Sequence, residues 1–400
     1  MSSTQSKFPS ASREDWHALV SAALKGGDPQ SLDRLDEDGL AIKALYDIAS
    51  YAAASPDACA ITRLPVNPAS HIAHGWDICQ PVMANGSAKD VNRLILDELQ
   101  DGVGTIWLQS LQTADLAGHL PAMMQDVVFA AAGIHLDAGN DVMAQIVAFA
   151  DFAKKADTNL AASRFHANID PFAPAADADL LASALAYFMS ADAGDVPPDM
   201  FRAQGWQWHN QGMTAVQELA YILASLTEIL RQGMARNIDP AHLAKHMSAS
   251  LALPADLFEG IAKCRALRRG WGAIVSALGL DPDAHRLCIH GAVSIRMFST
   301  VDSEVNMLRT TTALLGGAIG GADQLSAHAH NCLTGDDFLG RRLARMQQHL
   351  LIDESGLSRS LDPAGGAGFI EDRTDQLGLA AWSAFQQIEA DGGAIAAHQT

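Results

Sequence analysis

The sequence predicts an α/β protein built as a (β/α)8 TIM barrel. Short apolar runs alternate with longer helical stretches about seven or eight times over roughly 300 residues, and the connections between them are short. This alternation indicates parallel strands joined by crossover helices. A count near eight favours a closed barrel over an open sheet. The chain shows no repeat with a fixed period of about 20–50 residues, which excludes solenoids and propellers.

Composition excludes several classes of function. Apolar residues make up 48% and charged residues 18% of the 400 residues, which is typical of a chain with an ample core. The formal net charge of -19 would repel phosphate backbones and anionic bilayers, so we expect neither nucleic acid nor a membrane as a partner. The five cysteines include no C-x-x-C pair, and the N-terminal stretch lacks a signal-peptide core. We therefore expect a cytoplasmic protein.

The chain begins with an expected N-terminal arm (1–56), which precedes the barrel (57–335) and a C-terminal helical extension (336–400). A helix is predicted over 12–27, because Ser12 can cap it and a Gly-Gly pair ends it. Its apolar stripe consists of Trp16, Leu19, Val20, Ala23 and Leu24.

The barrel elements then follow in order. Strands are expected within 102–109, 127–139, 161–172, 247–253, 285–294 and 323–331, and "GWQWHNQG" (205–212) is interpreted as the end of another. Helices are expected over 88–101, 141–156, 180–191, 214–237, 256–279 and 304–322. In the extension, "DPAGG" (362–366) predicts a turn, and a helix is expected to start at Thr374.

Catalytic groups of such barrels lie at the C-terminal ends of the strands. The polar side chains that we expect there are Arg164, His166, Trp208, His209, His290, Ser294, His328, His330 and Asn331. One histidine at a strand end is more often a structural group than a catalyst. Several strand ends that bear histidines favour a functional site at this mouth.

Five blocks of sequence resemble the methylmalonyl-CoA mutase family, in the family's order. Three lie in the second half of the chain: "HNQGMTAVQELAYILASLTEILRQG" (209–233), "VNMLRTTTALLGGAIGGADQL" (305–325) and the stretch 342–393. "GWDICQ" (75–80) falls where the family has Trp-x-Ile-x-Gln. The opening, 8–26 with 38–46, resembles the start of the small, or beta, subunit.

The resemblance implies an isomerase that rearranges a short acyl-CoA through radicals generated from adenosylcobalamin. It also implies a barrel whose axis is lined by small polar residues and admits the coenzyme A tail. A small-subunit chain would form a heterodimer with a catalytic mutase chain and would be inactive alone. In the family, the N-terminal segment wraps that partner, so the arm is expected to contact it.

The resemblance also implies roles for individual residues. His209 stands where the family has the histidine that contacts the thioester carbonyl, and Trp208 replaces the neighbouring tyrosine. His290 stands where the catalytic chain has a histidine opening its His-x-Gln-Thr-Ser-Gly strand. The expected catalytic residues are therefore His209 and His290, and the expected substrate-binding residues are Trp208, Ser294 and Arg164.

The chain departs from the catalytic pattern at several positions. Cys79 replaces the arginine that pairs with the substrate carboxylate, and Ala292 replaces a glutamine. "DPDAHRL" (281–287) lacks the glycine of the cobalamin motif Asp-x-His-x-x-Gly, because Cys288 takes that place. We therefore expect a barrel without the family's C-terminal cobalamin domain. Adenosylcobalamin would be held by a partner chain, and no residue here is assigned to it.

Two alternatives stay open. The chain could bind acyl-CoA in a split mutase that a separate cobalamin-binding chain completes. It could also be a metal-dependent barrel hydrolase, because His328 and His330 form an H-x-H pair to which His290 or His209 could add a third zinc ligand.

Overall fold

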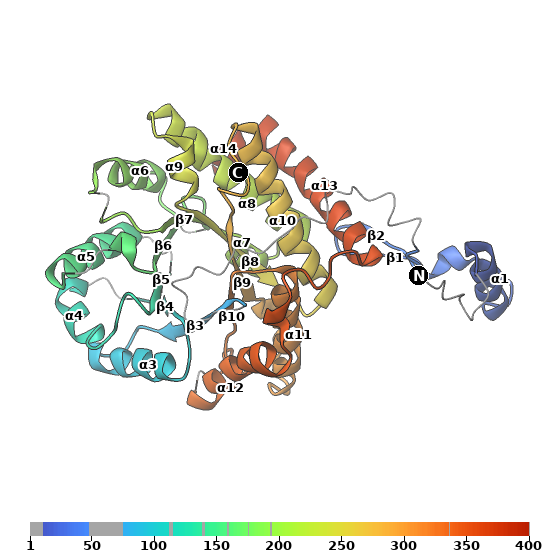
Figure 1. Cartoon of the computed structure of the whole chain (residues 1–400), viewed down its shortest axis with the longest axis horizontal. Coiled ribbons are helices and arrows are strands. Elements are labelled where there is room, and N and C mark those ends of the chain that lie inside the picture. Colours follow the sequence, from blue (N-terminus) through green and yellow to red (C-terminus); the bar gives the residue numbers. More distant parts are fainter. Residues whose placement is uncertain are drawn as a thin grey trace, which may run out of the picture.

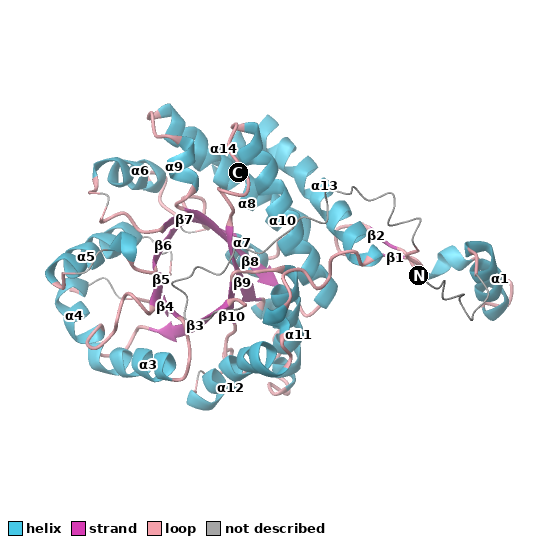
Figure 2. Ribbon diagram, in the orientation of Figure 1, coloured by secondary structure: helices cyan, strands magenta, loops and turns pink. Residues whose placement is uncertain are grey.

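The computed structural model of the chain describes residues 11–47, 75–111, 115–137, 141–157, 160–174, 176–192, 194–335 and 337–399. Its centre is a closed barrel of eight strands in the order β10-β3-β4-β5-β6-β7-β8-β9, and each neighbouring pair is parallel (Figure 2). The predicted (β/α)8 fold is therefore confirmed. The strands are β3 (Asp77–Met83), β4 (Thr105–Gln109), β5 (Gly133–Leu136), β6 (Phe165–Ile169), β7 (Asp199–Gln204), β8 (Met247–Leu253), β9 (Cys288–Val293) and β10 (Gln324–Ser326).

Helices surround this ring (Figure 1). They are α3 (Ala88–Gln100), α4 (Leu116–Met123), α5 (Val142–Lys155), α6 (Leu180–Ser190), α7 (Gly205–Asn210), α8 (Ala215–Ala235), α9 (Pro240–Ala244), α10 (Leu257–Ala277), α11 (Val305–Gly320) and α12 (Phe338–His349). The six helices expected from the barrel sequence are all present. In the part of the chain that is described, none of the helices combines the length and apolar character that a bilayer crossing requires.

The strands are buried on both faces, as parallel strands under helices must be. All seven residues of β8 are buried. On the outer face of the ring, Phe165 of β6 packs against Phe149 of α5 with ring centroids 4.9 Å apart. Apolar side chains thus fill the layer between strands and helices, whereas the axis of the barrel has a different lining.

The segment 205–212 corrects the sequence prediction, since it holds a short helix and no strand end. Strand β7 lies just upstream, and α7 packs between β8 and α8. Gly205 permits this contact. A Cβ atom there would lie 2.6 Å from Cδ1 of Ile222 and 2.9 Å from the backbone oxygen of Ser250. Only a residue without a side chain lets α7 begin so close to its neighbours.

The two ends of the described N-terminal arm differ in how they contact the rest of the chain. It consists of α1 (Arg13–Ala23), a 3-10 turn (Pro29–Leu32) and the pair β1 (Arg34–Leu35) and β2 (Ala41–Ile42). Ser12 caps α1 as predicted, but no residue of α1 is buried, and Leu19 is 74% exposed. The predicted apolar stripe is therefore only partly covered in the described chain, since Leu19 and Ala23 are exposed and Trp16, Val20 and Leu24 are half-buried. Figure 1 shows α1 standing away from the barrel.

The other end of the arm is held by the C-terminal extension, α13 (Gly368–Ala390) and α14 (Gly393–Gln399). Arg373 of α13 donates to Asp36 at 2.5 Å, and Lys43 meets Asp372 at 3.3 Å. The start of α13 at Gly368 is six residues before the expected Thr374. Its first turns are fixed by tertiary contacts, such as the 2.7 Å bond from buried Arg265 to Glu371. The boundary expected at 56/57, and Cys59, lie outside the described residues.

Candidate functional site at the barrel axis

Arg202 of β7 is the central group of the barrel interior. Its guanidinium donates to Nδ1 of His135 on β5 at 3.2 Å and to Nδ1 of His290 on β9 at 3.3 Å. Strands β5 and β9 are not neighbours of β7, so these bonds cross the interior. Arginine has only donors, hence both Nδ1 atoms accept, and neutral His135 and His290 carry their protons on Nε2. The Nε2–H of His290 donates to Oγ of Ser326 at 2.7 Å.

The charge of Arg202 is balanced by Asp199, which also binds His166. Oδ2 of Asp199 lies 3.4 Å from Arg202 and 2.6 Å from Nδ1 of His166. Burial raises the pKa of Asp199, but the hydrogen bond from His166 and the positive charge of Arg202 outweigh burial and leave this pKa below the ordinary value. The carboxylate therefore stays ionised.

The three axial histidines are neutral. Burial is the largest cause that lowers the pKa of His135, of His166 and of His290. The nearby positive charge of Arg202 lowers each of them further. Asp199 opposes this shift at His166 without reversing it.

Aromatic side chains gather toward the C-terminal end of the axis. Trp206 of α7 donates from its indole to the backbone oxygen of Val293, at 3.0 Å. Its ring stacks on His328, with centroids 5.6 Å apart, and meets Trp107 of β4 at 5.3 Å. Trp107 in turn touches the ring of His290. One indole from α7 thus reaches the ends of β4, β9 and β10 together.

An ion pair lies at the N-terminal end of the barrel. Arg164 binds Asp77 and donates at 3.2 Å to Thr105 and to the backbone oxygen of Gly104. Asp77 and Thr105 are the first residues of β3 and β4, and Arg164 immediately precedes β6. The expectation that Arg164 lies at the C-terminal mouth is therefore wrong. Arg164 lies one residue before the start of β6, so its side chain is at the N-terminal end of the barrel.

His209 and Ser294 come together at the C-terminal mouth, as expected. Nε2 of His209 lies 2.9 Å from Oγ of Ser294. Nδ1 of His209 faces Oε2 of Glu218 at 3.4 Å, without the alignment of a hydrogen bond. Burial raises the pKa of Glu218, but the charge of Lys263, 2.5 Å away, and the contact with His209 outweigh it, so the pKa is lowered overall.

This order of serine, histidine and carboxylate is that of an acyl-transfer triad, but the donors that such chemistry needs are engaged elsewhere. The backbone N–H of Ser294 donates to Leu253, and that of Ile295 donates to the side chain of Asn210. Ser294 itself is 2% exposed. The group therefore links β9, α7, α8 and α10 and has no oxyanion site beside the serine.

The other predicted residues are dispersed. His290 is the third residue of β9 and belongs to the axis, four residues before Ser294. Trp208 donates from its indole to the backbone oxygen of Phe172 and packs against Tyr221 of α8. Among the five predicted site residues, the contacts of the described chain join His209 with Ser294 and no other pair.

Sequence reasoning missed the groups that dominate the interior: Arg202, Asp199, His135 and Trp206. A signal existed, because "DMFRAQ" (199–204) places two charged residues within an otherwise apolar strand. Assigning the strand to 205–212 concealed it. The H-x-H pair gains no support as a metal site, since no group of three metal-ligating side chains is found in the described ranges.

Comparison with known proteins identifies similar chains. The methylmalonyl-CoA mutase family profile matches residues 171–400. The probable methylmalonyl-CoA mutase small subunit of Mycobacterium tuberculosis H37Rv is 33% identical over 398 residues, which cover 94% of this chain and 63% of that protein. The small subunit of Streptomyces virginiae is 31% identical, covering 99% of this chain and 66% of its own length. Methylmalonyl-CoA mutase of Escherichia coli K12 is 32% identical over 192 residues, covering 47% of this chain and 27% of that protein. The chain thus spans about two thirds of the small subunits that it matches.

Proposed function

Because the chain belongs to the methylmalonyl-CoA mutase family, we propose that it is a small-subunit-type barrel that supports a catalytic mutase chain and turns over no substrate itself. The partner would carry out the adenosylcobalamin-dependent rearrangement of a short acyl-CoA. This chain would contribute assembly and stability, as part of a heterodimer.

The contacts that bulky side chains make across the barrel interior are the observation that carries the proposal. A pantetheine arm needs an open passage along the barrel. Described side chains meet at three levels along the barrel: Arg164 with Asp77, then Arg202 with its histidines, then Trp107 with Trp206. Small polar residues such as Ser248 and Ser250 are present, as the resemblance implied, but bulky groups lie among them.

Two further residues support a barrel without turnover. Nε2 of His209, the atom that would donate to a thioester carbonyl, is bonded to Ser294. Cys79 cannot replace the expected arginine, because a thiol carries no positive charge and has no guanidinium donors. Burial raises the pKa of this thiol to about 12, so it stays neutral. Neither the thioester nor the carboxylate of a dicarboxylic acyl-CoA finds its expected partner.

The described barrel residues do not fit adenosylcobalamin. The cofactor would supply an organic radical by breaking its cobalt–carbon bond. Three of the histidines at and below the mouth have their Nε2 atoms engaged within the chain: His209 with Ser294, His290 with Ser326, and His328 with Gln109 at 3.3 Å. Nε2 of His135 and of His166 has no hydrogen-bond partner, but both atoms are buried. We therefore assign the cofactor to the partner chain and derive no step through it.

The three expected segments remain part of the proposal: an arm (1–56) for partner contact, the barrel (57–335) and its extension (336–400). The exposed side chains of α1 support the role of the arm, because a helix with no buried residue gains little stability from packing against its own chain. Exposed Leu19 and Leu35 offer apolar area to another protein.

The alternative is a substrate-binding subunit of a split mutase. The polar lining of the axis favours this alternative, because the interior of an ordinary barrel is packed with apolar side chains. Calorimetric titration of the isolated chain with methylmalonyl-CoA separates the two functions. Our proposal predicts no binding at micromolar concentrations and no turnover with adenosylcobalamin. It also predicts co-purification with a catalytic mutase chain. Saturable acyl-CoA binding by the isolated chain would establish the alternative instead.

A further inference from the structure

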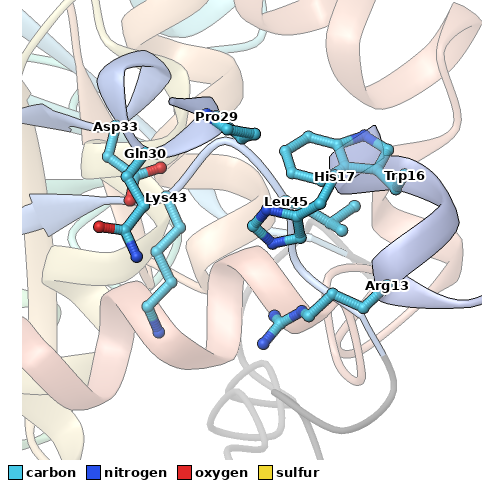
Figure 3. Close-up of a pocket in the computed structure, with 8 residues that line it drawn as sticks. All are labelled: Arg13, Trp16, His17, Pro29, Gln30, Asp33, Lys43 and Leu45. Carbon is cyan, nitrogen blue, oxygen red and sulfur yellow. The ribbon is translucent and has the colours of Figure 1, made fainter. Parts of the chain in front are cut away.

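A pocket of about 240 Å³ lies within the N-terminal arm, between α1 and the segment 29–45 (Figure 3). It is remote in the sequence from every residue of the barrel axis. Its lining consists of Arg13, Trp16, His17, Pro29, Gln30, Asp33, Lys43 and Leu45.

The lining is basic in a chain of strongly acidic composition. Arg13 and Lys43 are permanent cations, and Asp33 is the one carboxylate among the lining residues. The carboxylate of Asp33 is engaged within the arm, since its Oδ1 accepts a hydrogen bond from the backbone N–H of Ala44 at 2.8 Å. Figure 3 shows the charged ends of Arg13 and Lys43 on the same side of the pocket, below the ring of His17. Such a lining is complementary to an anionic group.

Both cations form ion pairs in which the cationic side chain is well exposed to solvent. Arg13 lies 3.1 Å from Asp47, and its side chain is 48% exposed. Lys43 lies 3.3 Å from Asp372, and its side chain is 43% exposed. Ion pairs this exposed contribute little to stability. The ammonium of Lys43 has three N–H donors, so it can donate to a second carboxylate while it keeps its ion pair with Asp372.

The surroundings of the pocket indicate a protein as the binding partner in preference to a free anion. Trp16 lines the pocket half-buried, and the same arm exposes Leu19, Leu32 and Leu35. Basic and aromatic groups next to exposed leucines are the composition of a protein interface. Because α1 stands away from the barrel, a second chain can reach the pocket and the leucines together (Figure 1).

We infer that this pocket receives an acidic side chain, aspartate or glutamate, of the catalytic mutase chain, with the leucines of the arm packing around it. The inference rests on the proposed function, which supplies the partner. It adds the chemistry of the contact, which is a carboxylate held between a guanidinium and an ammonium.

The test measures binding of the full chain to the catalytic mutase chain of the same organism, produced separately. The pocket variants are Arg13→Glu and Lys43→Glu. The matched control is Arg34→Glu, an exposed cation of the same arm that does not line the pocket. Circular dichroism checks that all variants fold. We expect each pocket variant to weaken binding about tenfold and to reduce its salt dependence, and the control to stay within about twofold of wild type.

The outcomes distinguish a failure of this inference from a failure of the proposed function on which it rests. If wild type binds and the pocket variants bind equally well, the inference is overturned while the proposed pairing stands. If wild type fails to bind the catalytic chain, both are overturned. A partner variant with one acidic side chain changed to lysine, and rescued by Lys43→Glu, would identify the carboxylate itself.

Discussion

Arg202 is the residue on which the order of the barrel interior depends most. It is 1% exposed, and it joins side chains from β5, β7, β8, β9 and β10 through His135, Asp199, Ser248, His290 and Gln324. A buried charge is tolerated only with such a complete set of partners. The network therefore fixes the relative positions of strands that share no ladder.

Replacing Arg202 with methionine should lower the free energy of unfolding by about 3–5 kcal/mol, because one partner of a buried ion pair is removed and Asp199 keeps its charge. Urea denaturation followed by circular dichroism measures this. Arg342→Met, at an exposed position of α12, serves as the control and should change stability by less than about 0.5 kcal/mol. A loss at Arg202 no larger than that of the control would contradict the role of the network.

The axial histidines give the fold a specific dependence on pH. The pKa of His135, of His166 and of His290 is lowered in the folded chain from an ordinary value of 6.5, first by burial. As pH falls below that ordinary value, these histidines bind protons in the unfolded chain but stay neutral in the folded chain. The free energy of unfolding therefore decreases. Stability from this source is complete above about pH 6.5 and is lost progressively toward the folded pKa values.

This pH dependence is measured by urea unfolding between about pH 5 and pH 7.5. His290→Gln should flatten the slope, since glutamine can accept from Arg202 and donate to Ser326 without titrating in this range. His119→Asn, on the exposed surface of α4, should leave the slope unchanged. An unaltered slope in His290→Gln would show that the histidine is not one of the titrating groups.

At the scale of elements, α7 closes the mouth of the barrel, and its position depends on Gly205. Gly205→Ala should destabilise the fold by about 1–3 kcal/mol, because the added methyl overlaps Ile222, Glu218 and the backbone of Ser250. Gly272→Ala in α10 is the matched control. There the nearest atom is 3.9 Å away, and alanine should stabilise the helix by up to about 1 kcal/mol.

The two glycine variants are compared by thermal or urea unfolding. Tryptophan fluorescence adds a local readout, because Trp206 lies on α7. We expect an altered emission for Gly205→Ala and an unaltered one for Gly272→Ala. Stabilisation of both variants would mean that α7 has room to shift.

The repeated elements of the fold were accessible from sequence because periodicity and caps are local. The capping Ser12 and the six barrel helices are examples. Positions along a strand were not accessible, because one or two residues decide which end of the barrel a side chain faces. Arg164 was therefore placed at the wrong end. The early start of α13 was missed for a related reason, since its ion pair with Arg265 joins positions far apart in the chain.

The candidate site was less predictable than the fold. The contact of His209 with Ser294 followed from placing both at one mouth. The central role of Arg202 did not, because it arises only when five strands close into a ring. A charged residue inside an apolar strand is a sign of such a role, yet the same sequence would be read as an exposed edge in an open sheet.

At the scale of the whole molecule, the chain joins a closed, self-sufficient barrel to an arm that buries nothing in α1. Stability is unevenly distributed in such a molecule, and a segment with few buried contacts opens without global unfolding. We therefore expect the amides of α1 to exchange with solvent much faster than those of β8, whose residues are all buried. Native-state hydrogen exchange measures both.

Removal of residues 1–27 extends this reasoning to assembly. The shortened chain should keep its free energy of unfolding within about 0.5 kcal/mol, since no buried residue of α1 is lost. It should lose binding to the catalytic mutase chain, because the wall of the basic pocket that carries Arg13 and His17 is gone. The two readouts are independent. A large loss of stability would show that α1 supports the barrel, whereas unchanged binding would place the partner surface elsewhere on the molecule.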